Sequence, residues 1–368
     1  MKILIDIGHP AHVHYFKNFI KIMSSKGHKF LISSRNKEME HYLLNAYDIP
    51  FVNRGKGKKS IFGKIAYLFK ADYLLIKQAK IFKPNLLLSF DSVYLSHVSK
   101  LLNIPHIAFD DTEHAKLEHL MSLPFTKTIL TPSCYNKDLG KNQIRFNGYM
   151  ELCYLHHNYF KPDPLVLELL GVKKDEKYII IRFVSWNASH DVGQTGLSLE
   201  MKHEIVKELS KYAKVFISSE GELPDDLKKY QIKIPPEKMH DALAFATLFL
   251  GEGATMASEC AMLGTPAIYI NSLTAGTLEE QEKSKLLFGF RNPKGVLEKA
   301  IELLSTSNLQ QEFQKRRQKM LADKIDVTAF MVWFIEKYPE SVNIMKENPS
   351  EIEKRFHRVN LDYQNKFR

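Results

Sequence analysis

Short apolar runs alternate with segments of helical period along most of the chain. The run KILIDI predicts a strand, and the helix after it places Val13, Phe16 and Ile20 on one face. Gly27 ends this helix and KFLISS begins the next strand, which completes one βαβ unit. Repeated units of this kind are typical of a parallel sheet covered by helices. The pattern therefore predicts an α/β fold.

The alternation falls into two series. Further strands of the first series are predicted in IPFV, NLLLSF, HIAF, TKTILT and QIRFNG. A proline-containing, charged stretch at 156–175 interrupts the pattern and predicts a linker with a short helix. Strands of the second series are predicted in KYIIIRFV, KVFISS, QIKIP, TLFLGEG and PAIYIN, and after about residue 295 the pattern is helical only.

Two domains are expected, because the core of a single domain stops growing near about 250 to 300 residues and this chain has 368. The predicted parts are an N-terminal Rossmann-like domain at 1–155, the linker at 156–175, a C-terminal Rossmann-like domain at 176–325 and C-terminal helices at 326–368. The apolar segment VTAFMVWFIEKY is expected to return to the first domain. Ligands of such sheets bind beyond the carboxyl ends of the strands, so we expect the site in a cleft between the domains.

Charge and cysteine content restrict the classes of partner. The formal net charge is +10, which favours an anionic partner such as a nucleotide, a phospholipid surface or a nucleic acid. No recognised nucleic-acid-binding motif accompanies the basic residues, so we expect no nucleic-acid partner. The three cysteines show no CxxC spacing, which supports neither a disulfide framework nor a zinc knuckle.

The sequence also bears on cellular location. The first residues, MKILIDIGHP, include Asp6 and too short an apolar run for the core of a signal peptide. No apolar run approaches the roughly 18 residues of a spanning helix. We therefore expect a cytoplasmic protein, and the excess positive charge suggests peripheral association with the inner face of an anionic membrane.

The stretch GEGATMASECAMLGTPAIYIN at 251–271 carries the clearest binding signal. A strand ends at two glycines, a helix opens near Thr255 and Gly264 ends it. Glycines allow close backbone approach, and free N–H groups at a helix start suit a diphosphate. Glu259, one turn into the helix, could accept hydrogen bonds from ribose hydroxyls. The alternative is an ordinary strand–turn–helix junction, since short glycine patterns are weak motifs.

Four carboxylates follow predicted strands of the first series. Asp91 follows NLLLSF, and Asp110, Asp111 and Glu113 follow HIAF. Carboxylates that cluster raise one another's pKa values, which suits them to proton transfer near neutral pH. The alternative for Asp91 is to cap a helix starting at Ser92, and for Asp111 to cap a helix that contains Glu113.

A third candidate region is RFVSWNASHDVGQTG at 182–196, which also follows a strand. Trp186, Asn187, His190 and Asp191 are specific choices for a loop, and loops on rigid sheets often carry function. Base stacking by Trp186 or contact of His190 with an acceptor is a plausible role. The alternative is a loop in which Asn187 and Asp191 form turns over a packed Trp186.

The first loop contains His9, His12 and His14. On the predicted helix His12 and His14 point to different sides, so the three rings are not expected to share one metal ion. His14 is best explained as a structural residue. An imidazole has an ordinary pKa near about 6.5 and can take a proton from a hydroxyl at neutral pH. We therefore interpret this region, with Gly8 and His12, as a catalytic or phosphate-contacting loop.

The chain resembles known families in four stretches. These are IDIGHPAHVHYFKN, FDDTEHA, IRFVSWNASHDVG and GEGATMASECAMLGTPAIY. Together they are similar to an uncharacterised prokaryotic family, number 354 in the domain-of-unknown-function series. The glycine stretch and the twin-domain pattern also resemble GT-B glycosyltransferases and non-hydrolysing UDP-N-acetylglucosamine 2-epimerases. The fold class implied is α/β and GT-B-like, with two doubly wound Rossmann-like domains facing a cleft and a C-terminal helix crossing back.

The resemblance implies roles for particular residues. The diphosphate and ribose contacts would fall on the second-domain residues Gly253, Ala254, Thr255, Met256 and Glu259. Some inverting GT-B transferases use a histidine of the first loop as base, which here would be His12. Asp110 or Glu113 would then orient the acceptor. In 2-epimerases Asp91 and Asp110 fall where the catalytic acids are kept.

The leading hypothesis is a metal-independent glycosyltransferase that takes a nucleotide-diphosphate sugar and builds a cell-surface polysaccharide or glycolipid. Its expected partners are the nucleotide sugar and a sugar or lipid-linked acceptor, without a further cofactor. The alternative is a nucleotide-sugar 2-epimerase, although the arginine-bearing loops of that family are replaced by GHPAHVH and SWNASHD. A non-catalytic nucleotide-binding protein is a second alternative, which leaves the acids and histidines without a role.

Overall fold

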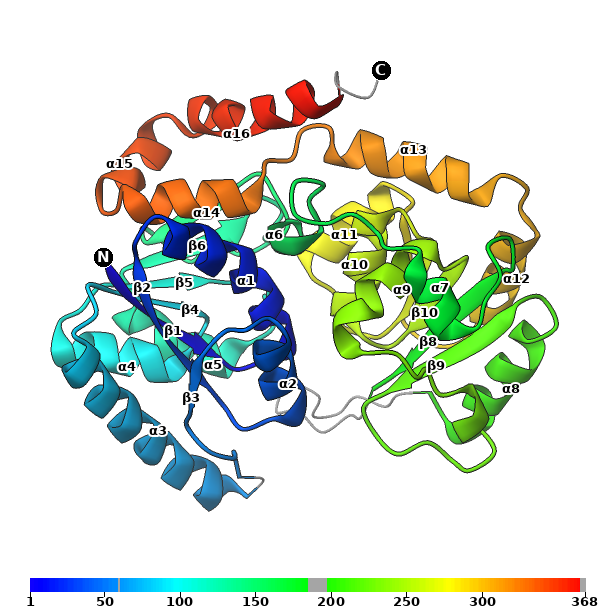
Figure 1. Cartoon of the computed structure of the whole chain (residues 1–368), viewed down its shortest axis with the longest axis horizontal. Coiled ribbons are helices and arrows are strands. Elements are labelled where there is room, and N and C mark those ends of the chain that lie inside the picture. Colours follow the sequence, from blue (N-terminus) through cyan, green and yellow to red (C-terminus); the bar gives the residue numbers. More distant parts are fainter. Residues whose placement is uncertain (59, 185–196, 365–368) are drawn as a thin grey trace. The chain divides into compact units, whose positions relative to one another are not determined.

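The computed structural model describes the chain except for residues 59, 185–196 and 365–368 (Figure 1). Two compact units make up the described chain. One contains Met1–Tyr159 and Lys324–Arg368, and the other contains Phe160–Asp323. The stretch expected to be a linker is thus divided between the units, and its second part forms the short helix α7 (Leu165–Leu170).

The first unit is built on a seven-stranded parallel sheet in the order β3-β2-β1-β4-β5-β6-β7. Its strands are β1 (Lys2–Ile7), β2 (Lys29–Ser34), β3 (Phe51–Asn53), β4 (Leu86–Phe90), β5 (His106–Phe109), β6 (Thr128–Pro132) and β7 (Gln143–Phe146). Its helices are α1 (Pro10–Ser25), α2 (Glu38–Ala46), α3 (Ile61–Phe82), α4 (Val93–Leu102), α5 (Lys116–Ser122), α6 (Leu152–Leu155), α14 (Val327–Glu336), α15 (Glu340–Glu347) and α16 (Pro349–Gln364).

The core of this unit follows from the apolar pattern. Every residue of β4 is buried, as continuous apolar strands of a parallel sheet require. The predicted face of α1 is buried as well, including Val13, Phe16 and Ile20. The strand order reverses at β1, whose neighbours are β2 and β4. The carboxyl ends of β1 and β4 therefore flank a topological switch point, where open parallel sheets bind ligands.

The second unit has a five-stranded parallel sheet in the order β12-β11-β10-β8-β9. Its strands are β8 (Tyr178–Phe183), β9 (Lys214–Ser219), β10 (Leu248–Gly251), β11 (Ala267–Ile270) and β12 (Leu287–Phe290). With α7 its helices are α8 (Leu199–Leu209), α9 (Met239–Phe245), α10 (Ala254–Leu263), α11 (Gly276–Lys283), α12 (Val296–Ser305) and α13 (Leu309–Leu321). Here the order reverses between β8 and β10, which makes their carboxyl ends the second switch point.

The two predicted series of strands are confirmed, with one difference at each edge of the second sheet. The prediction of a strand in QIKIP is wrong, because only Gln231 forms an isolated bridge, to Ile217, and Pro235 and Pro236 lead into a helical turn. The edge strand β12 was not predicted. Its sequence LFGF is short and contains Gly289, which weakens the β signal.

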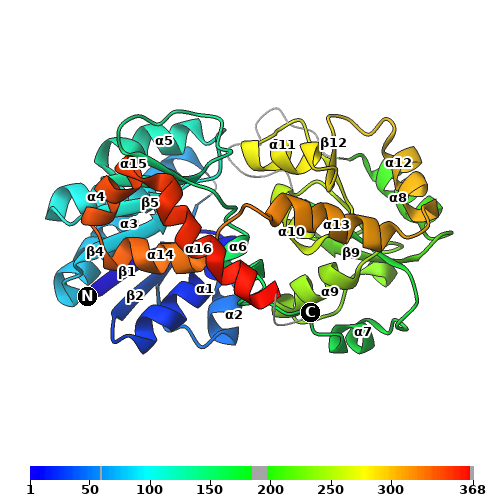
Figure 2. The ribbon, with the colours of Figure 1, turned by 90° about the horizontal axis from the view of Figure 1, so that it is seen from above.

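The C-terminal segment belongs to the first unit, as expected. Helix α14 packs on α1 and α6, and α15 and α16 follow beside it (Figure 2). Asp326 caps α14 by accepting from the Ala329 N–H at 2.9 Å, and it also accepts from the Tyr159 hydroxyl. Thr328 donates to the Cys153 carbonyl at 2.8 Å. These bonds join both ends of the chain into one core.

None of the helices in the described part of the chain combines the length and the apolar character needed to cross a bilayer.

Candidate functional site

Two aspartates lie side by side at the carboxyl ends of neighbouring strands in the first unit. Phe90 of β4 pairs in register with Phe109 of β5, and Asp91 and Asp110 are the next residues along each chain. The Asp91 N–H donates to the Phe109 carbonyl at 3.1 Å, which fixes the backbone beside β5. Sequence reasoning placed both carboxylates at strand ends, and the structure brings them together.

His119 on α5 connects the two carboxylates. Its Nε2 lies 2.8 Å from Asp110 Oδ2 and 3.7 Å from Asp91 Oδ2. Ser122, one turn further on the same helix, donates to Asp91 Oδ1 at 2.5 Å, and the Tyr135 hydroxyl donates to Asp110 Oδ2 at 2.6 Å. We call these five residues, Asp91, Asp110, His119, Ser122 and Tyr135, the carboxylate cluster.

The cluster alters the acidity of its members. Burial raises the pKa of Asp91 to about 6, and the neighbouring charge of Asp110 adds to the effect against the hydrogen bond from Ser122. Burial alone would lower the pKa of His119, but its contact with Asp110 and the charge of Asp91 raise it. The pKa of Tyr135 is raised by burial and by Asp110, so its phenol stays protonated. Asp91 can therefore exchange a proton near neutral pH.

The backbone of Asp91 is in an unusual conformation. Its φ of 41° lies in the left-handed region, which costs a residue with a side chain on the order of 1–3 kcal/mol. Asp91 does not cap the following helix, because Ser92 does so by accepting from the Leu95 N–H at 3.3 Å. Such strain is found where the surrounding structure fixes a residue for function.

Asp111 and Glu113 lie on an irregular segment instead of the helix that we expected to contain Glu113. The helix α5 begins only at Lys116, so Asp111 is not a helix cap. Burial raises the pKa of Asp111, as do the charges of Glu151 and Asp110. Glu113 accepts from the Asn136 N–H at 3.1 Å and so holds the loop that carries Tyr135.

The first loop lies next to this region of the sheet. His9 precedes α1 and caps it by accepting from the Ala11 N–H at 3.2 Å. The ring of His12 lies 4.9 Å from that of Phe90, the residue before Asp91. His14 is buried on the other side of α1, against the rings of Tyr47 and Tyr154. Only His12 of these three is placed beside the end of β4.

The hydrogen bond of His12 indicates its tautomer. The Gly8 N–H donates to His12 Nδ1 at 3.3 Å. Burial lowers the pKa of His12 well below its usual value, and the charges of His9, Lys37 and Arg54 add to this. In a neutral ring whose Nδ1 accepts, the proton sits on Nε2. His12 is thus arranged as a hydrogen-bond donor through Nε2, and the base role that we expected for it stays a prediction.

A buried ion pair missed by sequence reasoning holds this region together. Arg54 Nε donates to Asp6 Oδ1 at 3.0 Å, and both side chains are buried. The Ser92 hydroxyl donates to Asp6 Oδ2 at 2.6 Å, and Arg54 lies over the ring of Tyr94. The pair joins the ends of β1 and β3 to the start of α4. The only sequence signal was an acid inside an apolar strand, which requires a buried partner.

The corresponding region of the second unit is made of backbone. β10 ends at Gly251, where an added Cβ would lie 2.8 Å from Arg182 Cβ, so this glycine is needed for packing. Gly253 precedes α10 and no side chain caps that helix. A Cβ at Gly253 would find its nearest neighbour, in Val184, at 3.6 Å. The first turn of α10, which contains the predicted contacts Ala254, Thr255 and Met256, is accessible to solvent.

Glu252 fixes this region from within. Its buried carboxylate accepts from the Leu197 N–H at 2.6 Å and from the Val184 N–H at 3.2 Å. These are the described residues on either side of 185–196, so Glu252 ties both ends of that stretch to the end of β10. The predicted residues Trp186 and His190, like Asn187 and Asp191, lie outside the described part of the chain.

Glu259 lies inside the second unit. Its carboxylate oxygen is 2.9 Å from His240 Nε2 of α9, and both side chains are buried. The pair joins α10 to α9. The ribose contact suggested for Glu259 stays a prediction, and in this structure its carboxylate interacts with the protein.

The described residues also bear on metal binding. Among the described residues no group of three or more His, Cys, Asp or Glu side chains could hold a metal ion.

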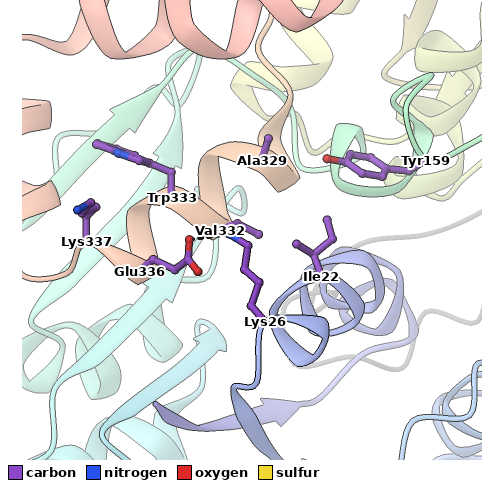
Figure 3. A pocket seen from close by; sticks show the side chains of 8 residues that line it. All are labelled: Ile22, Lys26, Tyr159, Ala329, Val332, Trp333, Glu336 and Lys337. Atoms are coloured by element: carbon purple, nitrogen blue, oxygen red, sulfur yellow. Dashed lines mark hydrogen bonds and ion pairs between the residues drawn. The ribbon is translucent and has the colours of Figure 1, made fainter.

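A shallow hollow of about 280 Å³ lies between α1 and α14, where Lys26 pairs with Glu336 at 2.8 Å (Figure 3). It is lined by Ile22, Lys26, Tyr159, Ala329, Val332, Trp333, Glu336 and Lys337. None of the predicted site residues that the structure describes lines it.

Solved structures show the same fold at low sequence identity. A UDP-GlcNAc 2-epimerase from Neisseria meningitidis bound to UDP-GlcNAc is 12% identical, with a TM-score of 0.66 over 92% of this chain and 100% of the other. The glycosyltransferase SsfS6 from Streptomyces sp. SF2575 is also 12% identical, with a TM-score of 0.55 over 92% of this chain and 100% of the other. These likenesses confirm the expected α/β, GT-B-like fold with two Rossmann-like domains.

Relatives in sequence extend over most of the chain. The uncharacterized protein MJ0665 of Methanocaldococcus jannaschii is 27% identical over 281 residues, which are 73% of this chain and 81% of the relative. The profile of one family matches residues 1–332, which contain every predicted site residue. The resemblance inferred from the sequence is confirmed, and the chain belongs to the family described as Protein of unknown function (DUF354).

Proposed function

We propose that this protein is a glycosyltransferase that uses a nucleotide-diphosphate sugar and acts in cell-surface polysaccharide or glycolipid synthesis. The carboxylate cluster carries the proposal. It places a carboxylate of raised pKa, Asp91, beside Asp110 and His119 at the carboxyl ends of β4 and β5, and β4 is one of the two strands of the switch point. The fold supports the class, because it is shared with proteins described as a glycosyltransferase and as epimerases of a UDP sugar.

Asp91 is the proposed general base. With a pKa of about 6 it is largely ionised at pH 7, yet it is more basic than an ordinary aspartate. Asp91 Oδ2 takes the proton of the acceptor hydroxyl while the acceptor oxygen bonds to the anomeric carbon of the sugar. The bond from that carbon to the diphosphate breaks at the same time. His119 and Ser122 orient the Asp91 carboxylate, and the Nε2–H of His12 donates to an oxygen of the substrate.

The start of α10 is the proposed diphosphate site. No side chain caps the helix at Gly253, so backbone N–H groups of the first turn can donate to an anion. The helix dipole adds about 0.3–1 kcal/mol for a negative charge at an exposed helix start. Both effects stabilise the nucleoside diphosphate as it leaves.

A nucleotide-sugar 2-epimerase is the second candidate, and one specific observation favours it. Epimerisation through elimination and re-addition of the nucleotide needs an acid as well as a base. Asp91 and Asp110 both lie against His119, and burial raises the pKa of Asp91. In this alternative the pair would shuttle the proton of the sugar without any acceptor.

Ligand-dependent stability tests the proposal. The purified protein is heated with a panel of nucleoside diphosphates and their sugars, with and without EDTA, and its Tm is recorded. A ligand at one hundred times its Kd adds about 2.7 kcal/mol of stability. We expect a Tm rise for one nucleotide sugar that EDTA does not change. No rise with any nucleotide would contradict the proposal.

Product analysis separates the two candidates. The protein is incubated with the nucleotide sugar that raises its Tm, and the sugar is followed by proton NMR. A transferase leaves the configuration at C2 of the sugar unchanged and releases nucleoside diphosphate only when an acceptor is added. An epimerised nucleotide sugar, formed without an acceptor, would establish the second candidate instead.

A further inference from the structure

Helix α3 has two apolar faces, and only one of them is used in the first unit. Tyr67, Ala71, Leu75 and Ala79 recur at every fourth position and are all buried. Leu75 and Ala79 pack in the core with residues of β1, β4 and α4. This inner face alone accounts for the docking of the helix on the unit.

The outer face of α3 exposes large apolar side chains. The exposed fraction is 86% for Phe62, 69% for Phe69 and 66% for Tyr73, and Ile65 lies between them at 48%. Their spacing of three and four residues places them in one stripe, which we call the outer stripe. Figure 1 shows α3 at the edge of its unit, where α4 lies beside it. Contiguous exposed apolar surface of this kind marks an interaction site.

The surroundings of the outer stripe are strongly positive. Residues 55–83 contain eight lysines and a single acid, Asp72. Asp72 does not offset them at the surface, because it bonds to His97 Nδ1 at 2.8 Å. Lys64, Lys70 and Lys77 are exposed on the helix that carries the stripe.

We propose that the outer stripe of α3 docks on an anionic lipid surface. Phe62, Phe69 and Tyr73 enter the headgroup region, and the exposed lysines contact lipid phosphates. Helices with an apolar face and a lysine-rich polar face lie in membrane interfaces in this way. Each basic residue near the outer stripe attracts an anionic membrane. A second copy of this chain would bring the same positive charge and would be repelled.

The net charge of the chain suggested membrane association without indicating which surface makes contact. The outer stripe of α3 is the proposed contact surface, and it sets the orientation of the first unit on the membrane. The inference does not depend on the reaction. The outer stripe lies on the side of α3 opposite to its buried residues, and the test of the inference uses no nucleotide.

Vesicle flotation with matched variants tests the proposal. The vesicles are of phosphatidylcholine, either pure or with about a third of phosphatidylglycerol. We expect the wild type to float only with the anionic vesicles. Phe69→Ser with Tyr73→Ser should lower the bound fraction about tenfold through lost apolar burial. Lys70→Glu with Lys77→Glu should lower it at least as much at low salt.

Two controls keep composition and charge matched. Leu165→Ser with Leu169→Ser removes two exposed apolar side chains from α7 of the second unit. Lys315→Glu with Lys319→Glu makes the same charge change at exposed positions of α13. Both should float like the wild type, and all variants should keep the wild-type Tm because the substituted side chains lie outside the core.

Three outcomes would overturn the proposal. One is equal flotation of the α3 variants and the wild type. Another is equal loss in the α3 variants and the controls, which would show that binding depends on overall charge. The third is a dimer in light scattering that the Phe69 and Tyr73 substitutions convert to a monomer without any vesicle binding by the wild type.

Discussion

The two sheets of this protein carry opposite kinds of group at their carboxyl ends. In the first unit the carboxyl ends of β4 and β5 carry ionisable side chains that contact one another, with Asp110 almost completely buried. In the second unit the end of β10 carries Gly253 and an uncapped helix start. Side chains with shifted pKa values can move protons, whereas open backbone N–H groups can hold an anion but cannot titrate. In the proposed function the first unit thus supplies the chemical site and the second unit supplies the binding site.

The largest effect is expected from removing the charge of Asp91. Asp91→Asn should lower turnover about 10²–10⁴-fold, because an amide cannot accept the proton of the acceptor. The Kd for the nucleotide should stay within about twofold, since the proposed diphosphate contacts lie in the second unit. Turnover is measured with the nucleotide sugar identified by its Tm shift, and the Kd by calorimetry.

Asp48→Asn is the matched control. Asp48 also has a left-handed backbone, with φ of 53°, but it is exposed at the end of α2 and lies outside the carboxylate cluster. The substitution should change neither turnover nor Kd. If Asp91→Asn weakened nucleotide binding as much as turnover, the division of roles between the two units would be refuted.

Asp91→Asn should also stabilise the protein at neutral pH. The pKa of Asp91 rises from 3.8 to about 6 on folding, mainly because the carboxyl group is buried. The charges of Asp110 and Glu118 also raise this pKa, whereas Ser122 and His119 lower it. The folded state therefore binds more protons than the unfolded state between these values, and stability falls as pH rises through that window. A shift of this size corresponds to on the order of 3 kcal/mol.

Denaturant unfolding from pH 3.5 to pH 8 measures this effect. The free energy of unfolding of Asp91→Asn should exceed that of the wild type above pH 7, and the difference should vanish near about pH 4. A difference that is constant with pH would mean that the carboxylate of Asp91 does not titrate in this window.

The sequence predicted the strands of both units and the strand-end positions of Asp91 and Asp110. It could do so because apolar runs and the residues that follow them are local features. The contact of Asp91 and Asp110 with His119 is not local, since the histidine comes from the next helix. A signal was present, because His119 and Ser122 lie three residues apart on one face of α5.

The ion pair of Asp6 and Arg54 shows the same limit more strongly. Its partners are separated by 48 residues and come from different strands, so only the strand order brings them together. The tautomer of His12 depends on one backbone hydrogen bond, which no residue pattern could supply. Patterns along the chain thus predicted elements, while pairing between elements decided the chemistry.

In the second unit, Gly253→Ala should weaken nucleotide binding about tenfold while leaving the fold intact. Among the described residues, and apart from its chain neighbours, the added methyl group meets no atom closer than 3.6 Å, so Tm should barely change. The methyl would instead occupy the approach of a diphosphate to the helix start. Calorimetry gives the Kd, and thermal unfolding gives the Tm.

Gly251→Ala is the contrasting variant. Its methyl group would lie 2.8 Å from Arg182 Cβ and from the ring of Phe249, so this substitution should lower Tm. Unchanged nucleotide binding in Gly253→Ala would remove the start of α10 as the diphosphate site.

The smallest effect is expected at His12, where two substitutions separate a donor from a base. Because His12 Nδ1 accepts from the Gly8 N–H, its Nε2–H is the group available to a substrate. Gln can donate from a similar position but cannot act as a base, so His12→Gln should keep turnover within about threefold. His12→Ala should lose about tenfold, the worth of one hydrogen bond. Equal losses in both variants would restore His12 as the base. Nitrogen NMR of the wild type tests the donor role independently of any assay of turnover, and it should show the proton on Nε2 and a pKa well below the usual value of a histidine.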